Sequence, residues 1–308
     1  MSNNDIKTPS WRGGQDAPAS TRIQKLEDLP AASAARRDCP DCHGTGISFR
    51  TVSEVATAQR CACMPFCGRC LDSGTVTAIV DGHVRTGRCR CQRPADRARL
   101  FTAAQIPGRY TDATLESYTK GILRHSPESM GVLQDVSRWM GAWKVGQENR
   151  GLILHGPVGR GKTHLLVAVV RDLILRHGVP ARFVEFTRLL SQLKAGYSAG
   201  RSGSEVIDPL VNIPVLAIDE LGKGRLTDWE LTIIDEIICR RYNAMACTLG
   251  STNFKPAFAT GAAPANAALV DVNPQTLGDR VGDRVLSRLQ EMCDFVELAG
   301  RDFRSLAT

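Results

Sequence analysis

The segment Gly156-Pro-Val-Gly-Arg-Gly161-Lys162-Thr163 constrains the fold of this chain more than any other feature. The apolar run GLILH precedes it and the apolar run THLLVAVVRDLIL extends from its last residue, so the pattern G-x4-G-K-T joins a predicted strand to a predicted helix. Glycines let the backbone turn around phosphate oxygens, and amide groups at a helix N-terminus attract negative charge. A chance glycine turn would give this pattern in roughly one chain in a hundred of this length. The sequence therefore predicts a phosphate-binding loop.

Two further acidic residues are predicted to complete a nucleotide site. The apolar run Val215–Ile218 ends in Asp219 and Glu220, and the C-terminal edge of a parallel strand is where such folds place ligand chemistry. We expect Lys162 to reach the β- and γ-phosphates of ATP, Thr163 and Asp219 to hold Mg²⁺, and Glu220 to act as general base toward water. An exposed acidic turn is the alternative reading of the pair. The full predicted nucleotide-binding set in this part of the chain is Gly156, Pro157, Val158, Gly159, Arg160, Gly161, Lys162, Thr163, His164 and Asp219.

Alternation of apolar strands and helical patterns continues to the end of the chain and predicts a parallel five-stranded α/β sheet with crossover helices. The predicted strands are Gly151–His155, Ala181–Phe186, Pro214–Ile218, Thr248–Thr252 and Phe295–Leu298. The predicted helices are Lys162–Arg176, Thr187–Tyr197, Thr227–Tyr242 and Leu277–Met292, with a connecting helix at Pro94–Gln105. The last long helix would carry Arg280, Arg284 and Arg288 on one face, because they repeat every four residues. Such a face is usually solvated or binds nucleic acid, but one arginine of it can also reach a neighbouring subunit's nucleotide.

A duplicated cysteine pattern precedes this core. Two units of C-x2-C-x18-C-x-C lie 28 residues apart, and a tetrahedron of four thiolates is the coordination that Zn²⁺ prefers. One ion per repeat is the simplest pairing, although the short spacing between Cys63 and Cys67 also allows an interleaved one. The predicted zinc ligands are Cys39, Cys42, Cys61, Cys63, Cys67, Cys70, Cys89 and Cys91. Small zinc modules obtain most of their folding free energy from the metal, about 10–16 kcal/mol in peptides.

Composition sets the context for both features. The chain has 11 cysteines, which in a chain without the apolar core of a signal peptide point to metal and to a cytoplasmic protein. Its longest aliphatic stretch is interrupted by Arg171, so no membrane partner is expected. The formal charge of +7 falls to +3 once eight thiolates and two Zn²⁺ are included, so charge alone is weak evidence for a nucleic-acid partner. The predicted domains are a disordered tail at 1–37 with a short helix near 22–29, zinc repeats at 38–93, a linker at 94–120 and an ATPase domain at 121–308.

These motifs and their order resemble the DnaC/DnaI-type helicase loaders, which are AAA+ ATPases related to DnaA and to IstB-type transposition proteins. The resemblance covers roughly Ile106 to the C-terminus. It is carried by IPGRYTDATLESY, by the run Asp219–Gly222, by the pair Arg241–Tyr242 and by GDRVLSRLQEMCDFVELAGRDFR. It implies a core without a C-terminal lid. The element CPDCHGTG also resembles the zinc repeats of DnaJ chaperones, although DnaJ has C-x2-C where each repeat here closes with C-x-C.

The loader family also implies roles for particular residues. Asn253 matches the sensor 1 position, Arg288 matches the arginine finger that drives ring or spiral self-assembly, and Arg304 matches a sensor-2-like phosphate contact. The region Thr187–Arg201 corresponds to the surface with which the family grips single-stranded DNA. Its candidate contacts are Arg188, Lys194, Tyr197 and Arg201, which a merely solvated helix face would also explain.

The resemblance implies an ATP-dependent loader that delivers a replicative helicase hexamer onto single-stranded DNA and releases it on hydrolysis. The N-terminal zinc domain would dock on the helicase, and the protein would work at a bacterial or phage-type nucleoid. A transposition helper of the IstB type, which would respond to a transposase and duplex DNA, is the first alternative. A zinc-dependent chaperone or adaptor that binds ATP without hydrolysing it is the second, and the intact Asp219–Glu220 pair speaks against it.

Overall fold

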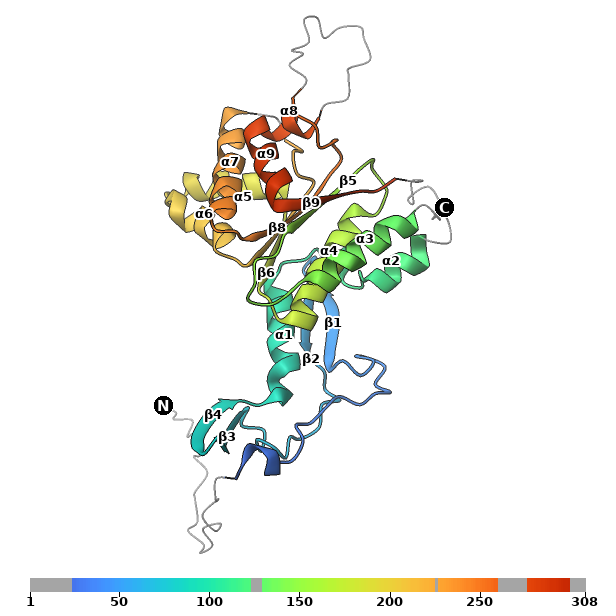
Figure 1. Ribbon diagram of the computed structural model, residues 1–308, viewed down its shortest axis with the longest axis vertical. Helices are drawn as coiled ribbons and strands as arrows, with labels where there is room; N and C mark the ends of the chain where they lie inside the picture. The colour runs from blue at the N-terminus through green and yellow to red at the C-terminus, as the bar shows by residue number, and fades with distance from the viewer. Residues whose placement is uncertain (1–23, 123–128, 225–226, 260–275, 300–308) are drawn as a thin grey trace, which may run out of the picture. The chain divides into compact units, whose positions relative to one another are not determined.

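The computed structural model describes residues 24–122, 129–224, 227–259 and 276–299 (Figure 1). The chain forms two compact units. One comprises Met1–Ala34 and Pro65–Gln92, and the other comprises Ala35–Met64 and Arg93–Thr308. The first cysteine repeat therefore belongs to the same unit as the predicted ATPase domain, whereas the second repeat belongs to the other unit. The sequence analysis groups both repeats in one domain at 38–93, and the division into units runs between them.

The larger unit is built on a parallel sheet of five strands in the order β6-β7-β8-β5-β9. The strands are β5 (Gly151–His155), β6 (Ala181–Glu185), β7 (Val215–Asp219), β8 (Cys247–Thr252) and β9 (Cys293–Glu297). Every residue of β7 and β8 is buried, as expected for central strands of a parallel sheet that helices cover on both faces. The predicted α/β fold with five parallel strands is thus confirmed.

Helices pack on both faces of this sheet (Figure 1). They are α1 (Arg93–Ala103), α2 (Leu115–Ile122), α3 (Ser129–Ala142), α4 (Lys162–Asp172), α5 (Phe186–Ser198), α6 (Gly203–Val211), α7 (Asp228–Asn243), α8 (Leu277–Val281) and α9 (Asp283–Met292). Leu152 and Leu154 of β5 join a core with α1, α3 and α4, whereas Ile153 between them joins the core with α5, α6, α7 and α9. The alternation follows from the two-residue period of a strand.

The predicted helix Leu277–Met292 is wrong as a single element. The chain breaks at Gly282, which has φ 85° and ψ 145°, and α8 and α9 are separate helices. Arg280 therefore does not share a helix face with Arg284 and Arg288. Its Nε instead donates to the carbonyl oxygen of Gly222 at 2.8 Å, and its guanidinium lies 5.1 Å from the Phe254 ring centroid. Helices α2, α3 and α6 were not predicted.

The two cysteine repeats form hairpins of the same design. In the larger unit β1 (Ile47–Val52) pairs antiparallel with β2 (Val55–Arg60), and in the smaller unit β3 (Thr75–Val80) pairs with β4 (His83–Arg88). The pair Phe49–Ala58 in the first hairpin corresponds to Thr77–Thr86 in the second, so the registers match at the 28-residue offset. The fold thus bears out the duplication that the sequence predicts.

Part of the segment predicted as a disordered tail lies in the smaller unit beside the second hairpin. The amide of Ile79 donates to the carbonyl oxygen of Gln24 at 3.0 Å, and the Arg69 guanidinium donates to that of Pro30 at 3.1 Å. A short 3-10 turn spans Leu26–Asp28, within the predicted helical stretch. Residues 1–23 lie outside the described part. None of the described helices combines the length and apolar character that crossing a membrane requires.

Candidate nucleotide and metal sites

The glycine loop joins β5 to α4 at the C-terminal edge of the sheet. Gly159 and Gly161 have φ values of 81° and 78°, in the left-handed region that glycine adopts without a Cβ penalty. Gly156 has φ 133°, and a Cβ there would lie 2.5 Å from the carbonyl oxygen of Leu298. The spacing of the glycines thus follows from the turn itself and from the close approach of the chain after β9.

Lys162 and Thr163, the first two residues of α4, point their polar atoms at this loop and at β7. Lys162 Nζ donates to the carbonyl oxygens of Gly156 at 2.8 Å and Pro157 at 2.7 Å, and the residue is 7% exposed. Thr163 Oγ1 lies 3.0 Å from Asp219 Oδ1 and 3.1 Å from its Oδ2. The Thr163 hydroxyl therefore donates directly to the Asp219 carboxylate. Hydroxyl and carboxylate oxygens are ligands that suit Mg²⁺.

A buried serine on the neighbouring strand β8 holds the acidic pair in place. Ser251 Oγ donates to Asp219 Oδ1 and accepts from the amide of Glu220 at 3.1 Å. Burial raises the pKa of the Asp219 carboxyl, while the hydrogen bonds from Ser251 and Thr163 act to lower it. The family resemblance implies a role for Asn253 but none for Ser251. The available signal for Ser251 was its position as a polar residue near the C-terminal end of a buried strand.

Glu220 occupies an uncommon backbone conformation just beyond β7. Its φ is 56°, in the left-handed region, and the amide of Leu221 fixes the turn by donating to the carbonyl oxygen of Ser251 at 2.7 Å. The Glu220 carboxylate pairs with Lys223 Nζ at 2.6 Å. That hydrogen bond raises the pKa of Lys223, so the ammonium stays charged beside the carboxylate. The turn places the Glu220 side chain on the wall of the adjacent cavity.

This cavity has a volume of about 690 Å³ and brings most of the predicted nucleotide residues together. The predicted residues among its lining are Val158, Gly159, Arg160, Gly161, Lys162, Thr163, His164, Glu220 and Asn253. Arg109, Tyr110, Ser117 and Tyr118 line it as well, although the sequence analysis gave them no role in the site. His164 lies against this second group, because its Nε2 is 2.9 Å from Ser117 Oγ. Burial lowers the pKa of His164, which favours the neutral imidazole.

The predicted arginines lie elsewhere. Arg288 on α9 is not part of the described lining of the cavity; its guanidinium lies 5.7 Å from the Tyr242 ring centroid, and its Nη1 donates to the Arg284 carbonyl oxygen at 3.1 Å. Arg304 lies outside the described residues. In the predicted DNA-binding region, Arg188 and Lys194 are exposed and Tyr197 is half-buried. The Tyr197 ring packs edge-on against Trp229, with 6.4 Å between ring centroids.

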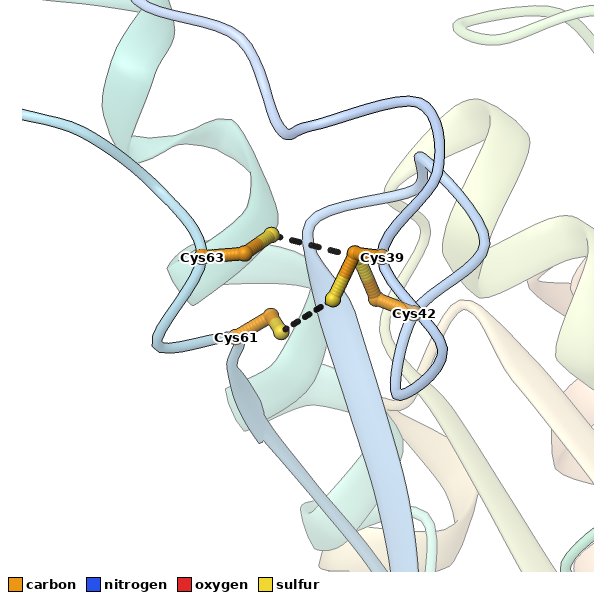
Figure 2. A group of neighbouring side chains, drawn as sticks. All are labelled: Cys39, Cys42, Cys61 and Cys63. Atoms are coloured by element: carbon orange, nitrogen blue, oxygen red, sulfur yellow. Dashed lines mark hydrogen bonds between the residues drawn. The ribbon is translucent and has the colours of Figure 1, made fainter.

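Each cysteine repeat gathers its own four sulfurs, all within 4.8 Å of one another. In the first repeat the Sγ atoms of Cys39 and Cys61 are 3.7 Å apart, and those of Cys42 and Cys63 are 3.5 Å apart. Dashed lines mark both pairs in Figure 2. In the second repeat the corresponding distances are 3.9 Å for Cys67 and Cys89 and 3.5 Å for Cys70 and Cys91. A tetrahedral ion with Zn–S bonds of about 2.3 Å needs sulfurs about 3.8 Å apart. Both groups therefore have the dimensions of a four-thiolate zinc site, with one ion per repeat.

Backbone amides favour the thiolate form that a metal needs. Burial raises the pKa of Cys39, but amide donors from Asp41 and Cys42 outweigh it and hold the pKa at about 7. Cys67 follows the same pattern: burial raises its pKa, and the amides of Ser33, Cys70 and Arg69 bring it down to about 6. A hydrogen bond to sulfur stabilises the negative charge of these two thiolates. Burial instead raises the pKa of Cys63 and of Cys91 to about 12, so a bound cation would have to displace those protons.

Comparison with known proteins places this geometry in a family. The profile of the IstB-like ATP binding protein family matches residues 141–306, which is more than half of the chain. The chain belongs to this family. The match contains the glycine loop, both acidic residues and Arg288.

Relatives of this IstB-like chain include helicase loaders and an insertion-sequence protein. The replicative helicase loader DnaC of Escherichia coli K12 is 28% identical over 139 residues, 45% of this chain and 49% of that protein. A putative ATP-binding protein in an insertion sequence of Mycobacterium tuberculosis is 34% identical over 112 residues, 36% of this chain and 41% of the relative. The chain spans about half the length of the curated relatives it matches. The crystal structure of the DnaC helicase loader superposes with a TM-score of 0.50 at 28% identity, covering 62% of this chain and 99% of the other.

Proposed function

We propose that this protein is an ATP-dependent loader that delivers a replicative helicase onto single-stranded DNA and releases it when ATP is hydrolysed. The observation that carries the proposal is the cavity in which Lys162, Thr163, Glu220 and Asn253 converge, with the Asp219 carboxylate behind Thr163. Similarity to the DnaC loader in sequence and in fold supports the choice of helicase loading among the functions open to an IstB-like ATPase.

The residues around the cavity have distinct roles in the proposed reaction. Lys162 exchanges its bonds to the loop carbonyls for phosphate oxygens, which a cation so close to the glycine amides is suited to do. Thr163 and Asp219 hold Mg²⁺, which when bound neutralises phosphate charge. Glu220 accepts a proton from the attacking water, and Asn253, which also lines the cavity, orients that water. We also propose that Arg304 contacts phosphate and that Arg288 acts on the nucleotide of a neighbouring copy.

We further propose that each cysteine repeat binds one Zn²⁺ and that the second repeat faces the helicase. The sulfur distances support the first part. For the second part, the smaller unit offers the hairpin strand β4, all of whose residues are exposed. Single-stranded DNA would run along α5, where Arg188 and Lys194 are exposed cations.

A transposition helper is the second candidate, and the insertion-sequence relative of Mycobacterium tuberculosis favours it. The two functions call for different partners, since a helper would respond to a transposase and duplex DNA. An ATP-binding adaptor without turnover is a third candidate, against which the acidic pair at the cavity argues.

ATPase assays with the full chain separate these candidates. We expect single-stranded DNA together with a helicase hexamer to stimulate turnover, whereas duplex DNA of the same length leaves it unchanged. Glu220→Gln should abolish turnover and keep nucleotide binding, since it removes the base and retains the shape of the side chain. Stimulation by duplex DNA alone would favour the transposition helper. Wild-type protein that binds ATP without any turnover would favour the adaptor.

A further inference from the structure

The two cysteine repeats differ where the first one contacts the ATPase core. At one cross-strand pair the first hairpin carries Phe49 and Ala58, and the second carries Thr77 and Thr86. The two threonines are exposed, with their hydroxyls 2.9 Å apart. Phe49 and Ala58 instead pack against the main hydrophobic core of the larger unit. The copies thus share a metal-site design but not a surface.

The turn of the first hairpin is bonded to the segment that leads into the nucleotide cavity. The amide of Ala56 donates to the carbonyl oxygen of Ile106 at 2.8 Å, and that of Gly108 donates to the carbonyl oxygen of Glu54 at 2.7 Å. The approach is close, because a Cβ on Gly108 would lie 2.2 Å from Thr51 Cγ2. Arg109 and Tyr110 follow directly and line the cavity. The hairpin therefore fixes one wall of the nucleotide site.

A second connection runs from the hairpin to the helix that carries the phosphate-binding residues. The Phe49 ring packs edge-on against Phe101 of α1, with 5.0 Å between ring centroids. The Arg171 guanidinium stacks 3.9 Å from the Phe49 centroid, and Arg171 belongs to α4, the helix that begins at Lys162. Hydrogen bonds between the Thr102 hydroxyl of α1 and the backbone of Ala58, at 2.9 and 3.2 Å, hold strand β2 against α1. The hairpin, α1 and α4 thus form one packed group.

The cysteines close the opposite end of the same hairpin. Cys39 and Cys42 precede β1 and Cys61 and Cys63 follow β2, as seen in Figure 2. A two-stranded hairpin is marginally stable by itself. An ion held by all four sulfurs would therefore tie the open ends of β1 and β2 together. Without the ion, the open ends of β1 and β2 are no longer joined, and the hairpin that supports the cavity wall is less firmly held.

We propose that the metal of the first tetracysteine site, Cys39, Cys42, Cys61 and Cys63, sets the affinity of the protein for nucleotide, and that the metal of the second site does not. The inference rests on the proposed zinc and ATP binding but not on helicase loading. Coupling between two sites is reciprocal, so nucleotide must also strengthen metal binding at the first site. The duplication has then produced one repeat that belongs to the nucleotide-binding unit and one that remains available for other contacts.

Matched variants of the full chain test the proposal, because the repeats correspond residue by residue. The double variants C61S/C63S and C89S/C91S each remove one site. Zinc content is measured by mass spectrometry, and nucleotide affinity by titration with a fluorescent ADP derivative. We expect one zinc in each variant and two in the wild type. The Kd for the ADP derivative should rise at least about fivefold in C61S/C63S, the lower end of typical coupling, and stay unchanged in C89S/C91S. Equal Kd values in the two variants would overturn the proposal.

A second measurement decides the question even where C61S/C63S fails to fold. A chelator is added to wild-type protein, and zinc release is followed with and without a non-hydrolysable ATP analogue. We expect the analogue to slow the release of one zinc and leave the other unchanged. Phe49→Thr, which installs the residue of the second repeat, should keep both ions and lose this protection. Protection of both ions or of neither refutes the coupling, and wild-type protein without zinc refutes its premise. Neither experiment contains a helicase or DNA, so its outcome does not test the loader proposal.

Discussion

Ser251 lies between the two acidic residues of the nucleotide site, and its hydroxyl contacts both. Replacing Ser251 by alanine removes a donor to the charged form of Asp219, whose pKa burial already raises. The pKa of Asp219 must then rise further. Because the proposed Mg²⁺ binding requires the carboxylate, the acidic limb of the pH profile of kcat/KM should move to higher pH. The expected displacement is about one pH unit, since a hydrogen bond to a charged group contributes about 1.5 kcal/mol.

Thr252→Val provides the control for this substitution. Thr252 is the next residue of β8 and is equally buried, but its hydroxyl donates to the carbonyl oxygen of Leu221 at 2.8 Å. Its loss should lower stability and leave the acidic limb in place. An unchanged pH profile in Ser251→Ala, or an equal displacement in both variants, would contradict the role given to Ser251.

At the scale of elements, the break between α8 and α9 depends on one glycine. Gly282 has φ 85° and ψ 145°, a conformation that L side chains rarely adopt, although a Cβ there meets no heavy atom within 4 Å. Gly282→Ala should therefore lower the free energy of unfolding by about 1–3 kcal/mol through backbone strain alone. Chemical denaturation measures this change.

Gly131 offers the opposite case for the same substitution. It lies inside α3 with nothing within 4 Å of an added Cβ and with no positive φ. Gly131→Ala should raise the free energy of unfolding by about 0.5–1 kcal/mol, because alanine loses less backbone entropy in a helix. Equal effects of the two substitutions would show that the Gly282 backbone is not strained by a side chain.

Sequence patterns predict the elements whose signal is local. Strands β5 and β7 are short, largely apolar runs, and the glycine loop depends on residues that adjoin one another. The break at Gly282 was missed because the apolar spacing continues through it, so glycine looked like one weak residue in a helix. Helix α6 was missed because it is short and contains Pro209. The role of Ser251 depends on β8 lying beside β7, a pairing between segments about 30 residues apart that no local pattern contains.

At the scale of the whole molecule, the two copies of the cysteine pattern lie in different units and have different surroundings. Tandem duplication makes it natural to expect a single domain. The apolar residues that attach the first copy to the core are Phe49 and Ala58, which read as ordinary strand residues in isolation. Their partners Phe101 and Thr102 lie more than forty residues further along the chain. The two copies differ at equivalent positions: Phe49 corresponds to Thr77, and Ala58 corresponds to Thr86.

Arg288 extends the proposed site beyond one copy of the chain. Its guanidinium lies over Tyr242, away from the described lining of its own cavity, so we expect it to act on a neighbour's nucleotide. Arg288→Ala should lower turnover by about 10³-fold or more and preserve nucleotide binding. Mixing Arg288→Ala with Glu220→Gln should restore activity, because about a quarter of neighbouring pairs then combine an intact base with an intact arginine. Arg284→Ala, one turn earlier, should leave turnover nearly unchanged. Mixtures that stay inactive while both variants bind nucleotide and assemble would place the action of Arg288 within its own subunit.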